Sequence, residues 1–200
     1  AIELFELNSS SRMMGDECIV PLVKAILILD GDGNRLAAKY YDKQEFPNDA
    51  EQTAFEQKLY RKTKQTNART EAEIIMFEKN VAVYRSSNDT RFLVVGSNEE
   101  NELILTGVLD GLHEALNVLL RGQTDRRSLL DSLELVILCI DEVVDGGMIL
   151  EMEPQSIASR ALMRGVDGGQ VPITELTIGQ ALASAREQLI KSMGNRNEGY

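Results

Sequence analysis

The chain has 200 residues, of which 43% are hydrophobic, and its 32 acidic against 21 basic side chains give a formal net charge of -11. This composition is typical of one globular domain with a substantial core, and the negative charge disfavours direct binding to nucleic acid or to anionic lipid headgroups. No segment approaches the ~18 consecutive apolar residues of a membrane span, and the 2 cysteines are too few for a disulfide framework. We therefore expect a soluble protein of a reducing, cytosolic compartment.

The first 21 residues are expected to lie outside the folded domain. The opening twelve, AIELFELNSSSR, begin without Met and precede Met13 and Met14, so we interpret them as vector-derived or read-through sequence. We assign residues 1–21 to a non-native or flexible leader.

The stretch VKAILILDGDGNRLAAKYY places Asp and Gly residues between two apolar runs. Asp30, Asp32 and Asn34 match the first three ligand positions of an EF-hand calcium loop. The sixth position is Arg35 instead of Gly, and the twelfth is Tyr41 instead of Glu, so a calcium ion would lack its closing ligand. The pattern therefore predicts a β-hairpin with a tight Asp-Gly turn, and neither a metal nor a phosphate site.

A capping box predicts the first helix. Asn48 is followed three residues later by Glu51, the spacing at which both side chains satisfy backbone N–H groups at a helix start. The helix should run to about Thr63, with Phe55 and Leu59 one turn apart on its buried face. The side chains expected in solvent are Glu56, Lys58, Arg61 and Lys62.

Three short runs with strand character follow, separated by polar turns. They are Ile74–Phe77, Val81–Tyr84 and Arg91–Val95, and they predict an antiparallel meander. Both faces of the opening strand are apolar, which predicts helices on both sides of the sheet. One face carries Val23, Ala25, Leu27 and Leu29, and the other carries Ile26 and Ile28.

Two long helical patterns come next. The first starts at Ser97 and Asn98, where oxygen caps and acids favour a helix N-terminus, and it stops at Gly122. The second runs from about Asp125 to the pair Gly146–Gly147. The buried stripe of the first helix is Leu105, Leu109, Leu112, Leu116 and Leu120.

The second helix carries two neighbouring apolar stripes, although packing on one sheet face needs only one of them. The stripe assigned to the core is Leu130, Leu133, Ile137, Ile140 and Val144, and the second stripe is Leu129, Val136, Cys139 and Val143. Either the preceding helix covers the second stripe, or a large partner buries part of it. We take Val136, Cys139 and Val143 as the candidate partner interface, and expect Val143→Glu to leave the fold intact while it abolishes pairing.

The helical and strand patterns become weaker toward the C-terminus. A short polar helix is expected after Pro154, then a linker at Gly165–Gly169, and then an amphipathic tail helix that begins at Thr174. The apolar side of this tail helix is Ile178, Leu182, Ala185 and Leu189. The predicted domain therefore spans residues 22–151, and residues 152–200 form a C-terminal extension with short helices.

The sequence contains no pattern typical of an active site or a cofactor site. His113 is the only histidine and lacks the second ligand of a metal site or the nucleophile of a catalytic triad, so we interpret it as structural. Asp141, Glu142 and Asp145 are interpreted as a solvated face at a helix end rather than as a catalytic carboxylate cluster. We therefore predict no catalytic, cofactor-binding or metal-binding residues, and no enzyme activity.

Four stretches, taken in their order and spacing, resemble the zeta subunits of coatomer, the COPI vesicle coat. They are VKAILILDGDGNRLAAKYY, KQTNARTEAEI, EENELIL and CIDEVVDGGMILE, and the resemblance extends from about Leu22 to about Lys191. Zeta subunits are similar to the small sigma subunits of clathrin adaptors. The resemblance implies an α+β, longin-like fold, a five-stranded antiparallel sheet flanked by helices in the order β-β-α-β-β-β-α-α with a C-terminal tail helix, which agrees with the elements predicted above.

The same resemblance implies a non-enzymatic protein without a cofactor. Its direct partner would be the trunk of the gamma subunit, next to the other coatomer subunits. An Arf-family GTPase would bring the coat to Golgi membranes for Golgi-to-ER retrograde and intra-Golgi transport. The alternatives are a sigma subunit of a clathrin adaptor and a small-molecule-binding α/β domain. We assign no dileucine-signal pocket, because the residues of that sigma-subunit site cannot be matched here one by one.

Overall fold

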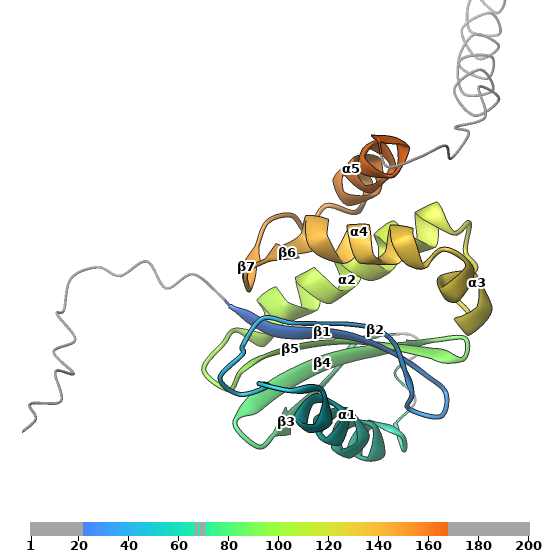
Figure 1. Ribbon diagram of the computed structural model, residues 1–200. Helices are drawn as coiled ribbons and strands as arrows, with labels where there is room; N and C mark the ends of the chain where they lie inside the picture. Colours follow the sequence, from blue (N-terminus) through green and yellow to red (C-terminus); the bar gives the residue numbers. More distant parts are fainter. Residues whose placement is uncertain (1–21, 67, 69–70, 168–200) are drawn as a thin grey trace, which may run out of the picture.

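A five-stranded antiparallel sheet lies between one helix on one face and the other described helices on the opposite face (Figure 1). This computed structural model describes residues 22–66, 68 and 71–167. The leader and the tail helix predicted from Thr174 lie outside the described residues. The predicted α+β, longin-like architecture is confirmed.

The strands lie in the spatial order β2-β1-β5-β4-β3. They are β1 (Val23–Asp30), β2 (Arg35–Tyr40), β3 (Glu73–Phe77), β4 (Asn80–Ser87) and β5 (Thr90–Ser97). Helix α1 (Asp49–Thr63) covers one face of the sheet. The opposite side carries α2 (Glu102–Leu119), α3 (Arg126–Asp131), α4 (Leu133–Val143) and α5 (Pro154–Asp167). A two-stranded ribbon, β6 (Val144–Asp145) and β7 (Met148–Ile149), follows α4.

The Asp- and Gly-rich stretch is a turn, as predicted. The Asp30 carboxylate accepts backbone hydrogen bonds from Asp32 N at 2.9 Å and from Asn34 N at 2.8 Å, so it stabilises the loop between β1 and β2. Gly33 has φ +86° and lies against the ring of Tyr60, where an added Cβ would come within 2.5 Å of ring carbons. The loop is therefore fixed both by its own side chains and by α1.

The sheet buries apolar side chains on both faces, as predicted. Leu27 and Leu29 pack on the α1 side, whereas Ile26 and Ile28 pack on the side of α2 and α4. The predicted placement of Val23 on the face of Leu27 is wrong. The β1–β5 register shifts just after Val23, and this irregularity turns its side chain to the α2 side.

Helix α1 has the predicted N-cap, Asn48, but only the Asn48 half of the predicted capping box bonds a backbone N–H. The Asn48 side chain accepts from Glu51 N at 2.9 Å, and its amide donates to the Glu51 carboxylate at 3.2 Å. The prediction that Glu56 lies in solvent is wrong. Its buried carboxylate accepts hydrogen bonds from Arg35 Nε and Tyr40 OH, both at 2.8 Å, and these β2 side chains compensate for its burial.

Helix α2 starts later than Asn98, the start predicted from the sequence. Strand β5 continues through Ser97, and the helix N-cap is Asn101, whose side chain accepts from Leu103 N at 2.9 Å. The helix ends before Gly122, which has φ +83°, as predicted. The predicted leucine stripe is confirmed: Leu105, Leu109, Leu112 and Leu116 are fully buried and Leu120 is partly buried.

Helix α5 packs as part of the domain. Ile157 and Ala161 lie in the same core as α2 and α4, and Arg164 Nε lies 2.7 Å from a carboxylate oxygen of Glu142 on α4. The domain boundary predicted at residue 151 is therefore too early, and the linker predicted from Gly165 begins inside α5. The cause is that the buried side of this helix consists mostly of small residues, so its sequence resembles that of a polar extension.

Candidate partner interface

Helix α4 buries the residues predicted to be at the surface, and it exposes part of the stripe predicted to be in the core. Val136, Cys139 and Val143, the predicted interface residues, are at most 1% exposed and lie in the core. Of the stripe predicted for the core, Ile140 and Val144 are fully buried, whereas Leu133 and Ile137 are 39% and 37% exposed. The surface placement of Val136, Cys139 and Val143 is therefore wrong.

The physical reason is that helix α4 is apolar on all sides across residues 135–140, and that α2 and α5 both pack against it. The predicted long helix is also interrupted at Ser132, whose backbone has φ -120° and ψ 30°, so α3 ends before it and α4 starts after it. Which side of such a helix is buried depends on neighbours that are distant in the sequence.

Cys139 is enclosed by the core. Burial, and secondly the charge of Glu142, raise the pKa of its thiol to about 12. At neutral pH the thiol is therefore protonated and shielded from solvent, which excludes it as a nucleophile or a metal ligand in the folded chain.

The acids at the end of α4 have separate environments. The prediction of a solvated face is wrong for Glu142, which is buried and faces Arg160 and Arg164 of α5. Asp141 pairs with Lys39 of β2. Asp145, in β6, is exposed. Across residues 22–66, 68 and 71–167, no three His, Cys, Asp or Glu side chains are grouped as a metal site requires.

His113 is buried on α2 against Phe92, with ring centroids 5.1 Å apart and an interplanar angle of 84°. Burial, and secondly the positive charge of Arg85, lower the pKa of His113 below its usual range, although Glu114 and Asp110 act in the opposite direction. The side chain is therefore a neutral part of the core at physiological pH.

The lowered pKa of His113 predicts a pH-dependent stability. Below about pH 6.5 the unfolded chain takes up a proton on this side chain, whereas the folded chain does so only at lower pH. The free energy of unfolding should therefore fall as the pH drops from about 6.5 toward the folded pKa, and His113→Leu should flatten this decline. Urea unfolding of both chains at about pH 7.5 and about pH 5.5 measures the difference, and equal declines would contradict the prediction.

Two groups of exposed apolar side chains are candidates for a partner surface. The α3–α4 face consists of Leu130, Leu133 and Ile137, which are 37% to 42% exposed. The terminal ridge lies around the start of β1, where Leu22 forms a β-bridge with Met148, and its members are 44% to 77% exposed. It consists of Leu22, Leu103, Met148, Leu150 and Met152.

The β6–β7 hairpin and the segment after it build most of the terminal ridge. Gly146 and Gly147 have φ of +57° and +87°, as a tight two-residue hairpin turn requires. The sequence predicts only that they end a helix, whereas in the structure they connect two strands. Met148, Leu150 and Met152 are exposed at every second position, while the residues between them are partly buried. The alternation in MILEM was the available signal in the sequence, because side chains two positions apart share one face of an extended segment.

The described region matches one protein family. Residues 22–167 match the family model of the clathrin adaptor complex small chain. Coatomer subunit zeta-1 of Arabidopsis thaliana is 47% identical over 173 residues, which are 86% of this chain and 97% of that relative. Coatomer subunit zeta-1 of Homo sapiens is 48% identical over 167 residues, which are 84% of this chain and 90% of that relative.

A solved-structure comparison supports the same fold. A chain in a homology model of the full-length AP-3 complex superposes with a TM-score of 0.58 at 16% identity, covering 74% of this chain and 96% of that chain. No helix in the part of the chain that the structure describes is long and apolar enough to cross a membrane. The chain therefore belongs to the small-chain family of clathrin adaptor complexes and, within it, to the coatomer zeta subunits, the small subunits of a vesicle coat.

Proposed function

We propose that this chain is a non-enzymatic subunit of the COPI coat that pairs directly with the trunk of the gamma subunit. The likeness to coatomer zeta subunits over nearly their whole length is the observation that carries the proposal. In this role the chain holds its place in the coat through protein contacts, and it serves Golgi-to-ER retrograde and intra-Golgi transport. An Arf-family GTPase recruits the assembled coat to Golgi membranes, so the chain itself reaches the membrane only indirectly.

The charge of the chain supports a role through protein contacts. At a formal net charge of -11 it is repelled by anionic headgroups, so attachment to a bilayer has to come from other coat subunits. The exposed apolar groups of the α3–α4 face and the terminal ridge offer surfaces that a large partner can bury.

Co-expression with candidate large subunits tests the proposal. The tagged chain should form a stable complex with the gamma-coatomer trunk and not with the large subunit of a clathrin adaptor, as measured by affinity purification followed by size-exclusion chromatography. Pairing with the clathrin-adaptor subunit instead would favour the sigma-subunit alternative. A chain that binds neither subunit but retains a small molecule would favour the small-molecule-binding alternative.

A further inference from the structure

The terminal ridge is continuous across three parts of the chain. Leu22 forms a β-bridge with Met148, which joins the start of the sheet to the β6–β7 hairpin. The extended segment then carries the ridge through Leu150 to Met152, whose sulfur lies 3.3 Å from the position a Cβ on Gly107 of α2 would take. Leu103, 77% exposed, lies one helical turn before that glycine.

A pocket of about 250 Å³ opens beside the ridge. Its lining includes Leu22, Gly147, Asp42 and Glu100, so it lies between the β6–β7 turn, the start of β1 and the loop that leads into α2. This volume is below the range of most small-molecule sites and suits a single apolar side chain. Together, the ridge and the pocket have the form of a protein interface, in which an apolar anchor fills a hollow.

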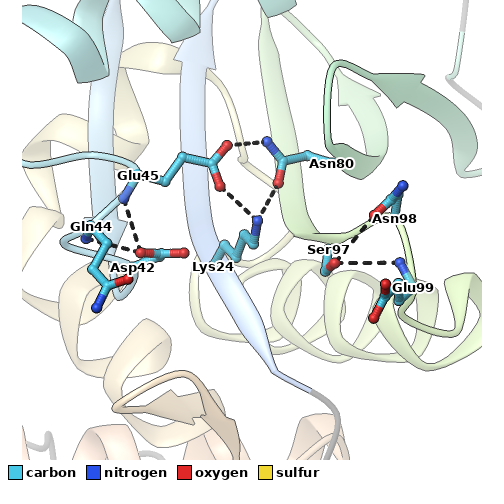
Figure 2. A network of polar contacts seen from close by, with 8 residues as sticks. All are labelled: Lys24, Asp42, Gln44, Glu45, Asn80, Ser97, Asn98 and Glu99. Atoms are coloured by element: carbon cyan, nitrogen blue, oxygen red, sulfur yellow. Dashed lines mark hydrogen bonds and ion pairs between the residues drawn. The ribbon is translucent and has the colours of Figure 1, made fainter. Parts of the chain in front are cut away.

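A closed polar network fixes the wall of this pocket (Figure 2). Lys24 Nζ donates to the Glu45 carboxylate at 2.6 Å and to Asn80 Oδ1 at 2.8 Å, and Asn80 Nδ2 donates to the same carboxylate at 2.6 Å. Glu45 therefore compensates the charge of Lys24, which also lines the pocket. The Asp42 carboxylate accepts from Gln44 N and Glu45 N, both at 3.0 Å, so the loop keeps its acid at the pocket.

Acidic side chains surround the ridge and the pocket. Seven acids either line the pocket or lie next along the chain or across the hairpin from a residue of the ridge or pocket. One of them, Glu151, pairs with Arg160, and the other six form no ion pair with a described side chain. They are Asp42, Glu99, Glu100, Glu102, Asp145 and Glu153. The exposed cations in the neighbouring loops are Lys43 and Lys79. The surface is thus apolar at its centre and negative at its rim.

We propose that the terminal ridge and its pocket form the docking surface for a basic segment of the gamma subunit, with an apolar anchor side chain flanked by Lys or Arg. This inference rests on the proposed function and assigns the surface of that pairing. A bilayer with anionic lipid would be repelled by the acidic rim, and a second copy of this chain would place the same acids against one another. The α3–α4 face fits such a segment less well, because the pocket next to it contains Leu130 as its one apolar residue among charges of both signs.

Matched substitutions separate the two surfaces. In binding to the gamma trunk, measured by calorimetry or biolayer interferometry, Leu150→Lys should weaken the affinity by about tenfold or more. The control Ile137→Lys, on the α3–α4 face, should change it by less than about twofold, as expected for a position outside the interface. Both side chains are exposed, at 54% and 37%, so thermal unfolding should confirm that both variants keep the fold.

The double variant Glu100→Lys with Glu102→Lys should weaken both the binding and its salt dependence. The control Glu134→Lys on α4 should change neither of them.

Peroxide footprinting reports on the ridge directly. Met148 and Met152 should be oxidised in the free chain and protected in the complex, with the exposed Met76 on β3 showing that peroxide reaches the free chain. Protection of both ridge methionines in the free chain would overturn the inference, because another part of the chain would then cover the ridge. Binding to phosphatidylserine-containing vesicles that Leu150→Lys abolishes would also overturn it.

The binding results distinguish the two proposals. A wild-type chain that fails to bind the gamma trunk overturns the proposed function and this inference with it. If the wild-type chain binds and Leu150→Lys binds equally well, the proposed function stands. Only the assignment of the terminal ridge as the docking surface is then overturned.

Discussion

Val143→Glu is expected to unfold the chain. Val143 is fully buried at the end of α4, and its carbonyl accepts from Leu150 N at 2.8 Å, so the helix end and the following segment both depend on its position. A glutamate here would place a carboxylate in the apolar core without a hydrogen-bonding partner, at a cost of several kcal/mol, against a total stability of about 5–15 kcal/mol for a typical domain. Circular dichroism during heating should show no cooperative transition, or one at a much lower temperature.

The control for this prediction lies on the same helix. Ile137→Glu places the same charge on a side chain that is 37% exposed, and should lower the unfolding temperature by only a few degrees. A Val143→Glu chain that melts like the wild type would contradict the burial, and would restore the surface placement that the sequence suggested.

Gly111→Ala is expected to destabilise the chain although alanine is the better helix former. A Cβ at this position of α2 would lie 2.4 Å from the backbone carbonyl oxygen of Met152, and backbone cannot move aside as a flexible side chain can. The segment that leads into α5 would have to lift from α2. We expect a net loss of about 1–3 kcal/mol, despite the gain of about 1 kcal/mol in helix propensity. Urea unfolding measures the loss, and hydrogen exchange should show α5 opening first.

Gly107→Ala provides the matched control one turn away. The nearest atom to its added Cβ is the sulfur of Met152 at 3.3 Å, which belongs to a flexible side chain. This variant should be as stable as the wild type or slightly more so, because the propensity gain remains. Equal effects at both glycines would show that the close approach of the 150–153 segment to Gly111 does not determine the stability.

Most of the fold could be predicted, because the signals for its turns, helix starts and buried helix faces are local. The turn after Asp30 and the capping box at Asn48 each depend on residues within a few positions of one another. The leucine stripe of α2 repeats over several turns, so small errors at the helix start did not change which face is buried.

Of the candidate interface, the alternation in MILEM is a local signal for the exposed residues after the β6–β7 turn. Which side of α4 is buried could not be predicted, because it depends on neighbours that are distant in the sequence. The break at Ser132 has neither Gly nor Pro to mark it, and α4 has apolar residues on every side. The buried acids Glu56 and Glu142 depend on arginines from other elements, Arg35 and Arg164 respectively. The sequence shows that these residues are apolar or charged, but the neighbours in the folded chain decide which of them reach the surface.

The strand order has a consequence for synthesis on the ribosome. Strand β1 pairs with β5, which emerges only after α1, β3 and β4. Until then the aliphatic run of β1 can pair with β2 on one side, while its other edge has no partner strand. An unpaired apolar strand edge is prone to association with other chains, so the nascent protein is most exposed to misassembly before β5 is translated.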